Sequence, residues 1–215
     1  MAIARLSTPT GPIELSYEAH GDSEAVVLLV AGHFPASVWH PVAVPMLTGA
    51  GYRVVTFDNR GMPPSTVPEP GYQVSDLAAD TAALIEHLSI DPCHLVGASL
   101  GGLITQTLAL ARPDLVATAS FIAGTGDYSA GGKLAMAACH AAYASGAPAA
   151  TMAAAIVAMA VPVPLWHDQK AVDAAMSAAR STLTRDNSTH RGRLGHRHCQ
   201  LGHDHDLFLF RDPKM

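Results

Sequence analysis

The chain has 215 residues, a length that fits one domain of ordinary size or one domain with an excursion. It is 49% hydrophobic and 14% charged, which supplies ample apolar side chain for a core and excludes a disordered or fibrous chain. The formal net charge of −5 excludes a basic surface for nucleic acid or for an anionic membrane.

The first part of the chain predicts strands that alternate with helices. Strands are expected at 13–17, 26–30 and 52–57, with a helical stretch around 38–51. The run 26–30 is continuously apolar, as expected for a strand covered by helices on both faces, and 52–57 is interpreted as a second buried strand.

The alternation continues to about residue 123. Ser75 is expected to cap a helix that Asp91-Pro92 ends, followed by a short strand at 94–97. An apolar helix at 100–112 ends before Pro113, and 115–123 is predicted to be another buried strand. This order predicts an α/β fold with a mostly parallel sheet and helices on both faces.

Two shifts in composition divide the chain. We expect an α/β core at 1–128, an alanine-rich helical cap at 129–184, and an atypical tail rich in histidine and arginine at 185–215. The tail lacks the hydrophobic period of a further strand and helix, so the last strands of the sheet are expected to be missing.

The strongest chemical signal is the segment Gly97-Ala98-Ser99-Leu100-Gly101-Gly102, between a predicted strand and a predicted helix. A sharp strand-to-helix turn lifts a serine clear of the sheet and leaves no room for side chains two residues away, where Gly97 and Gly101 stand. The amides that begin the helix can stabilise an oxyanion. The alternative is a glycine-rich phosphate loop, which is disfavoured because neither GxGxxG nor GxxxxGK[ST] is present.

With this turn, the segments LLVAGHFPASVW (28–39) and YRVVTFDNRGMPPS (52–65) resemble the α/β-hydrolase superfamily, in particular its cofactor-free haloperoxidase and esterase-like branch. The resemblance implies the α/β-hydrolase fold and no cofactor or metal. It implies Ser99 as the nucleophile, with the amides of His33 and Leu100 as the oxyanion hole. Asp58, Asn59, Arg60 and Gly61 are expected to hold loops by hydrogen bonds and an ion pair.

The partners of Ser99 are harder to place. The resemblance implies an acid and then a histidine after later strands, yet about thirty residues follow the cap, too few for two more strand-and-helix units. The chain is therefore interpreted as C-terminally truncated or altered, as by a shifted reading frame. Asp127 is a candidate acid or a plain turn residue, Asp204 and Asp206 are later acid candidates, and His203 and His205 are candidate bases if the tail folds back.

Other histidines and cysteines have less specific interpretations. The tail donors His196, His198, Cys199, His203 and His205 could bind a metal, or form a histidine-rich tail with adventitious affinity. We expect His20, His87, His94 and His140 on surfaces or helix faces. Cys93, Cys139 and Cys199 form no disulfide framework, and no secretory signal or membrane span is predicted, so a cytoplasmic location is expected.

The expected function is hydrolysis of an ester, a thioester or a related small apolar acyl compound, impaired if triad members are missing. The alternative is a non-catalytic relative that binds a small apolar ligand or a partner through the same cleft. Missing strands would expose a sheet edge, so a homodimer is also possible. No nucleic-acid or membrane partner is expected.

Overall fold

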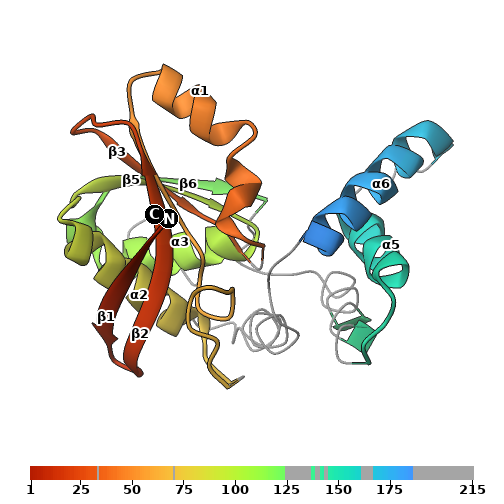
Figure 1. Cartoon of the computed structure of the whole chain (residues 1–215), viewed down its shortest axis with the longest axis horizontal. Coiled ribbons are helices and arrows are strands. Elements are labelled where there is room, and N and C mark those ends of the chain that lie inside the picture. The colour runs from red at the N-terminus through yellow and green to blue at the C-terminus, as the bar shows by residue number, and fades with distance from the viewer. Residues whose placement is uncertain are drawn as a thin grey trace, which may run out of the picture.

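The structure is a computed structural model, and it describes residues 1–32, 34–69, 71–123, 137–138, 141–142, 145–160 and 167–185. Figure 1 shows a sheet flanked by helices, together with a separate pair of helices from later in the chain. The strands are β1 (Ala2–Thr8), β2 (Gly11–His20), β3 (Val26–Val30), β4 (Arg53–Phe57), β5 (Cys93–Ala98) and β6 (Val116–Ile122). The helices are η1 (Ala36–Trp39), α1 (Ala43–Gly49), α2 (Val74–Leu88), α3 (Leu100–Ala111), η2 (Pro113–Leu115), α5 (Ala149–Ala160) and α6 (Gln169–Arg185).

The six strands form one sheet in the order β1-β2-β4-β3-β5-β6. The pairs β1–β2 and β2–β4 are antiparallel, whereas β4, β3, β5 and β6 run parallel to one another. The predicted mostly parallel sheet is confirmed, and β1 adds a strand that the sequence analysis does not predict.

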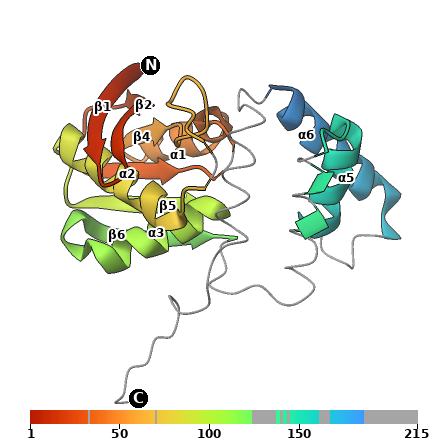
Figure 2. The same cartoon turned by 90° about the horizontal axis from the view of Figure 1, so that it is seen from below.

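Helices cover both faces of the sheet, as predicted (Figure 2). The larger core joins α2 and α3 to one face, and it takes in Val26, Leu28 and Val30 of β3. The smaller core joins α1 to the other face through Val27 and Leu29. Successive residues of a strand point to opposite faces, which explains why all five residues of β3 are buried.

The loop after β4 continues the pairing of β2 where β4 has ended. The backbone N–H of Ser16 donates to Ser65 Oγ at 2.8 Å, and Ser65 Oγ donates to the carbonyl oxygen of Asp58 at 2.7 Å. The N–H of Thr66 donates to the carbonyl oxygen of Glu14 at 2.9 Å. The loop is therefore hydrogen-bonded to β2 as a further strand would be.

Helix α2 begins differently from the prediction, which placed its cap at Ser75. The helix starts at Val74, and the carboxylate of Asp76 accepts the backbone N–H of Gln73 at 2.7 Å. A carboxylate three residues after the cap can reach back to the free amide, whereas Ser75 lies inside the first turn.

Strand β6 is present, but the prediction that it is buried is wrong. It forms an edge of the described sheet, and most of its side chains are exposed, including Phe121 at 46% and Ile122 at 49%. An apolar sequence shows that a strand can be buried. Burial also requires helices or loops packed against both faces of the strand, and a strand at the edge of a sheet has fewer of these.

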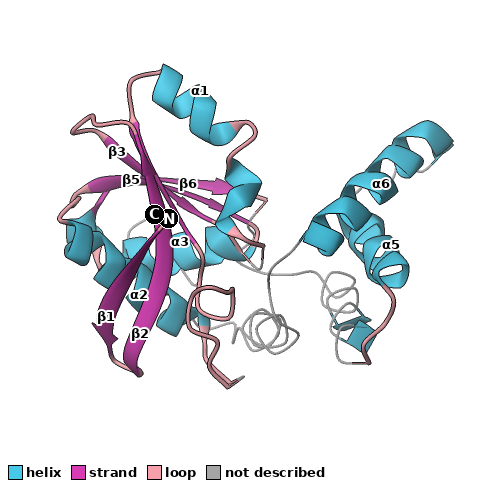
Figure 3. Ribbon diagram, in the orientation of Figure 1, coloured by secondary structure: helices cyan, strands magenta, loops and turns pink. Residues whose placement is uncertain are grey.

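Helices α5 and α6 pack against each other around the fully buried Ala153 (Figure 3). They fall in the segment predicted to form a helical cap, although α6 ends at Arg185, one residue past the predicted boundary. Across the described part of the chain, no helix has the length and apolar character needed to cross a membrane.

Candidate active site

Ser99 lies in a sharp turn between β5 and α3. Its backbone has φ 55° and ψ −120°, a left-handed conformation that residues other than glycine rarely adopt. Its N–H donates to the carbonyl oxygen of Ile122 in β6 at 2.9 Å, and its side chain is half-buried rather than sunk in the core. The predicted strand–turn–helix geometry at Ser99 is confirmed.

The two glycines around Ser99 occupy positions that no larger residue can share. A Cβ atom at Gly97 would overlap the carbonyl group of Gly101 and the hydroxyl of Thr105. A Cβ atom at Gly101 would overlap the carbonyl oxygen of Val30 in β3. The predicted steric demand at both positions is therefore present, and it brings α3 against the end of β3.

The loop after β3 lies beside the first residue of α3. A Cβ atom built on Gly32 would be 3.4 Å from the backbone nitrogen of Leu100 and 3.2 Å from its Cβ. The first amides of a helix have no acceptor within the helix, and here the N–H groups of Gly102 and Leu103 donate to the carbonyl oxygen of Ser99, which leaves the earlier Leu100 amide as the candidate donor for an oxyanion. His33, the other predicted oxyanion-hole residue, lies outside the described residues.

Asp58 and Asn59 hold the backbone on both sides of position 33. Asn59 Nδ2 donates to the carbonyl oxygens of Ala31 at 2.6 Å and Gly32 at 3.1 Å. Asp58 Oδ1 accepts the backbone N–H of Ala36 at 2.7 Å. Both side chains are buried. The predicted structural role of Asp58 is confirmed, and the specific role of Asn59 in positioning this loop is new.

The predicted ion pair is formed by Arg60 and Asp80. Arg60 donates from Nε and from a terminal nitrogen to the two carboxylate oxygens of Asp80, both at 2.6 Å, and the pair is buried. Arg60 also donates to Thr10 Oγ1 at 2.9 Å and lies over the ring of Tyr72. A bidentate pair fixes the guanidinium plane, so the loop after β4 is held to α2.

Cys93 is not a second nucleophile. It lies fully buried at the start of β5, and burial raises the pKa of its thiol to about 12. Because a thiolate is the reactive form, the protonated thiol is inert at neutral pH.

The remaining predicted site residues cannot be compared with the structure. Asp127, His203 and His205 lie outside the described residues, as do Asp204, Asp206, His140 and the donors of the tail. Of the other histidines expected on surfaces, His87 is exposed, whereas His20 and His94 are half-buried.

Residues 25–138 match the alpha/beta hydrolase fold family. This match covers more than half of the chain, and the sheet order and the turn at Ser99 accompany it. The chain belongs to the alpha/beta hydrolase fold family.

Two curated relatives indicate the branch of the family. Over 114 residues the chain is 41% identical to "Putative non-heme bromoperoxidase BpoC" of Mycobacterium tuberculosis, covering 53% of this chain and 43% of that protein. Over 107 residues it is 39% identical to "Putative carbamate hydrolase RutD" of Variovorax paradoxus, covering 48% and 40%. The haloperoxidase-like branch inferred from the sequence is supported, and the matched part spans less than half the length of each relative.

Solved structures extend the likeness over most of the chain. The crystal structure of BpoC from M. tuberculosis superposes with a TM-score of 0.74 at 31% identity, covering 87% of this chain and 69% of that one. An esterase from Thermogutta terrifontis superposes with a TM-score of 0.73 at 20% identity, covering 94% and 73%. The second likeness shows the shared fold alone.

Proposed function

We propose that the chain carries the nucleophile half of a serine hydrolase and that Ser99 is the nucleophile. The observation that carries this proposal is the backbone of Ser99, at φ 55° between two glycines that admit no Cβ. Strain of this kind is retained where a function needs the side chain in one place. Here it presents a half-buried hydroxyl beside the N-terminus of α3.

In the proposed reaction, Ser99 Oγ attacks the carbonyl carbon of an acyl substrate while its proton passes to a general base. The carbonyl oxygen becomes an oxyanion, the bond to the leaving group then breaks, and an acyl-enzyme forms. Water adds to the acyl-enzyme in the second half, which releases the acid and restores the hydroxyl.

The proposed oxyanion hole consists of the backbone amides of Leu100 and His33. The position of Gly32 against the nitrogen of Leu100 supports this pairing, since it places the loop and the helix terminus side by side. Loss of one fixed donor in such a site typically slows the chemical step about 10²–10³-fold.

Asp127 is the proposed acid, and His203 or His205 the proposed base. If no histidine acts as the base, the turn and the oxyanion hole alone would still support a reaction rate about 10³–10⁴-fold above the rate in water. The printed name of one relative, a carbamate hydrolase, supports hydrolysis at a carbonyl group. We therefore propose an ester, thioester or related apolar acyl substrate, in a cytoplasmic protein.

A fluorophosphonate probe tests the nucleophile directly. We expect a covalent adduct on the peptide that contains Ser99, detected by mass spectrometry, and its complete loss in Ser99→Ala. Ser89 is a matched control, because it also has a positive φ (50°) and is exposed, yet it ends α2 rather than preceding a helix N-terminus. Ser89→Ala should label like the unchanged chain.

Absence of an adduct on folded protein would reject the proposed nucleophile and favour a relative that only binds a ligand. Where labelling occurs, hydrolysis rates of p-nitrophenyl esters with short and medium acyl chains measure the substrate preference. Ser99→Ala provides the background rate for that series.

A further inference from the structure

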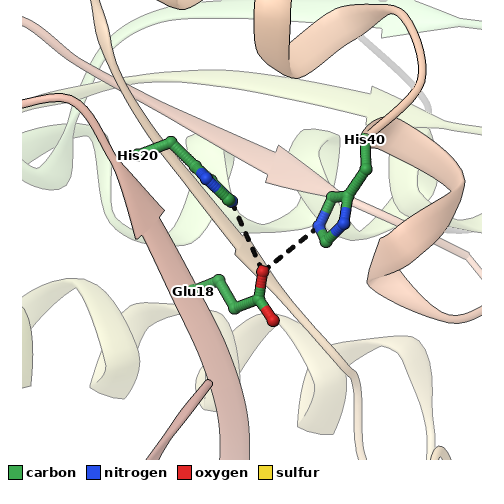
Figure 4. Close-up of side chains that lie close together, drawn as sticks. All are labelled: Glu18, His20 and His40. Atoms are coloured by element: carbon green, nitrogen blue, oxygen red, sulfur yellow. Dashed lines mark ion pairs between the residues drawn. The ribbon is translucent and has the colours of Figure 1, made fainter.

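Away from the turn at Ser99, three side chains with metal-binding atoms lie close together at β2. Glu18 and His20 lie two residues apart on β2, so their side chains share one face of the sheet. Their partners across the strand pair are Thr56 and Val54 of β4. His40 directly follows η1, and its ring lies over the same face (Figure 4).

Both imidazole rings direct Nε2 at one carboxylate oxygen (Figure 4). Nε2 of His20 lies 3.5 Å from Glu18 Oε2, and Nε2 of His40 lies 3.6 Å from the same oxygen. These separations are too long for good N–H···O hydrogen bonds. They agree with the spacing of about 3.4 Å between two ligand atoms that each bind one tetrahedral ion at about 2.1 Å.

The surroundings leave the His20 nitrogen without another role. Its Nε2 atom is buried and has no hydrogen-bond partner, although the ring as a whole is 31% exposed. The two rings meet edge to face with centroids 5.4 Å apart, and all three donor atoms lie within 4.8 Å of one another. A buried ring nitrogen without a partner is uncommon, and a bound cation would satisfy it.

We propose that Glu18 Oε2, His20 Nε2 and His40 Nε2 bind one divalent transition-metal ion, for which zinc is the expected probe. Two imidazoles and one carboxylate favour such an ion over calcium or magnesium, which take oxygen ligands. Three protein ligands leave one tetrahedral position for water. Glu18 and His40 also line a cavity of about 240 Å³, which gives the ion a route to the site.

The ion would connect β2 to the end of η1. The other carboxylate oxygen of Glu18 lies 3.9 Å from the amino group of Met1, which competes as a cation for the same side chain. The bound ion would stabilise the folded chain because it binds the assembled site and not the separated ligands. This inference is independent of the reaction proposed for Ser99.

Calorimetric titration of the chelator-treated full chain with ZnCl₂ tests the proposal. We expect one equivalent of zinc to bind tightly to the chain, which is called the tight equivalent below, and the melting temperature to rise. Glu18→Gln, His20→Ala and His40→Ala should each weaken that equivalent by at least about tenfold, since even outer-shell changes cost 10–100-fold. All three side chains are about one-third exposed, so the variants should fold, which circular dichroism checks.

Two controls separate this site from other histidines. His94→Ala removes a half-buried imidazole of β5 that bonds to Thr118, and it should leave the tight equivalent unchanged. A combined variant with His196, His198, His203 and His205 changed to Ala and Cys199 to Ser should also retain it. The proposal is overturned if the unchanged chain has no tight equivalent, if His20→Ala and His40→Ala bind as the unchanged chain does, or if the tail variant alone abolishes binding.

Discussion

Strands β3 and β6 both run parallel to β5, one on each side, yet their surroundings differ. Every residue of β3 is buried, whereas most of β6 is exposed. Both strands hold the turn at Ser99: the carbonyl oxygen of Val30 at the end of β3 faces Gly101, and the carbonyl oxygen of Ile122 in β6 accepts the Ser99 N–H. The candidate nucleophile is thus fixed by a strand in the core on one side and by a strand at an edge on the other.

The largest effect is expected on the β3 side, at Gly101. A methyl group at this position overlaps the Val30 carbonyl oxygen, so Gly101→Ala should lower the free energy of unfolding by about 3 kcal/mol or more. Urea unfolding followed by circular dichroism measures the change. Gly49→Ala is the control, because no atom beyond its chain neighbours and the adjoining helix backbone lies within 4 Å of its Cβ position at the end of α1. Equal stabilities of the two variants would contradict the close approach of α3 to β3.

Hydrogen exchange compares the two strands directly. Amides of Val26–Val30 should exchange about 100-fold more slowly than those of Val116–Ile122, because strands buried on both faces open only with the whole domain. Peptide-resolved mass spectrometry measures both segments in one experiment. Equal protection of the two strands from hydrogen exchange would mean that β6 is as well shielded from solvent as β3.

Asn59→Ala tests the support of the loop after β3. Two buried carbonyl oxygens lose their donor, so we expect a loss of about 1–3 kcal/mol in unfolding free energy and slower labelling of Ser99. Gln169→Ala removes an exposed amide that donates to Asp173 in α6 at 2.9 Å, and it should change neither quantity measurably. Unchanged labelling in Asn59→Ala would show that the loop does not depend on this side chain.

The smallest effect on stability is expected at the β6 edge. Phe121→Lys replaces a half-exposed side chain and should change the unfolding free energy by no more than about 0.5 kcal/mol. If the homodimer considered in the sequence analysis forms along β6, this variant should dissociate it, as measured by analytical ultracentrifugation. Ile3→Lys places the same charge on β1 at the opposite edge and should leave association unchanged. Equal association of both variants would exclude β6 as the interface.

The sequence predicts the centre of the sheet well because local patterns are sufficient there. The apolar run of β3 predicts a strand that is buried on both faces. The spacing of Gly97, Ser99 and Gly101 predicts a sharp strand-to-helix turn. The burial of β6 could not be predicted in this way, because it depends on what lies beside the strand rather than on its own residues.

The side chains that act across distant segments were the hardest to predict. Asn59 follows β4 but bonds to the loop after β3, and no local pattern identifies its acceptors. Likewise, Glu18 and His20 meet His40 only because η1 lies over β2 and β4. The alternation within β2 shows that Glu18 and His20 share a face, but it does not identify a third ligand twenty residues away.

The hydroxyl of Ser65 has a consequence for how the chain avoids unwanted pairing. Because it accepts from the Ser16 N–H and donates to the Asp58 carbonyl oxygen, while the Thr66 N–H donates to the Glu14 carbonyl oxygen, a short hydroxymethyl side chain takes the place of backbone hydrogen bonds where two strands separate. The polar groups of β2 beyond the last residue of β4 are thereby occupied from within the molecule. An extended peptide could not dock at this place without first displacing the loop.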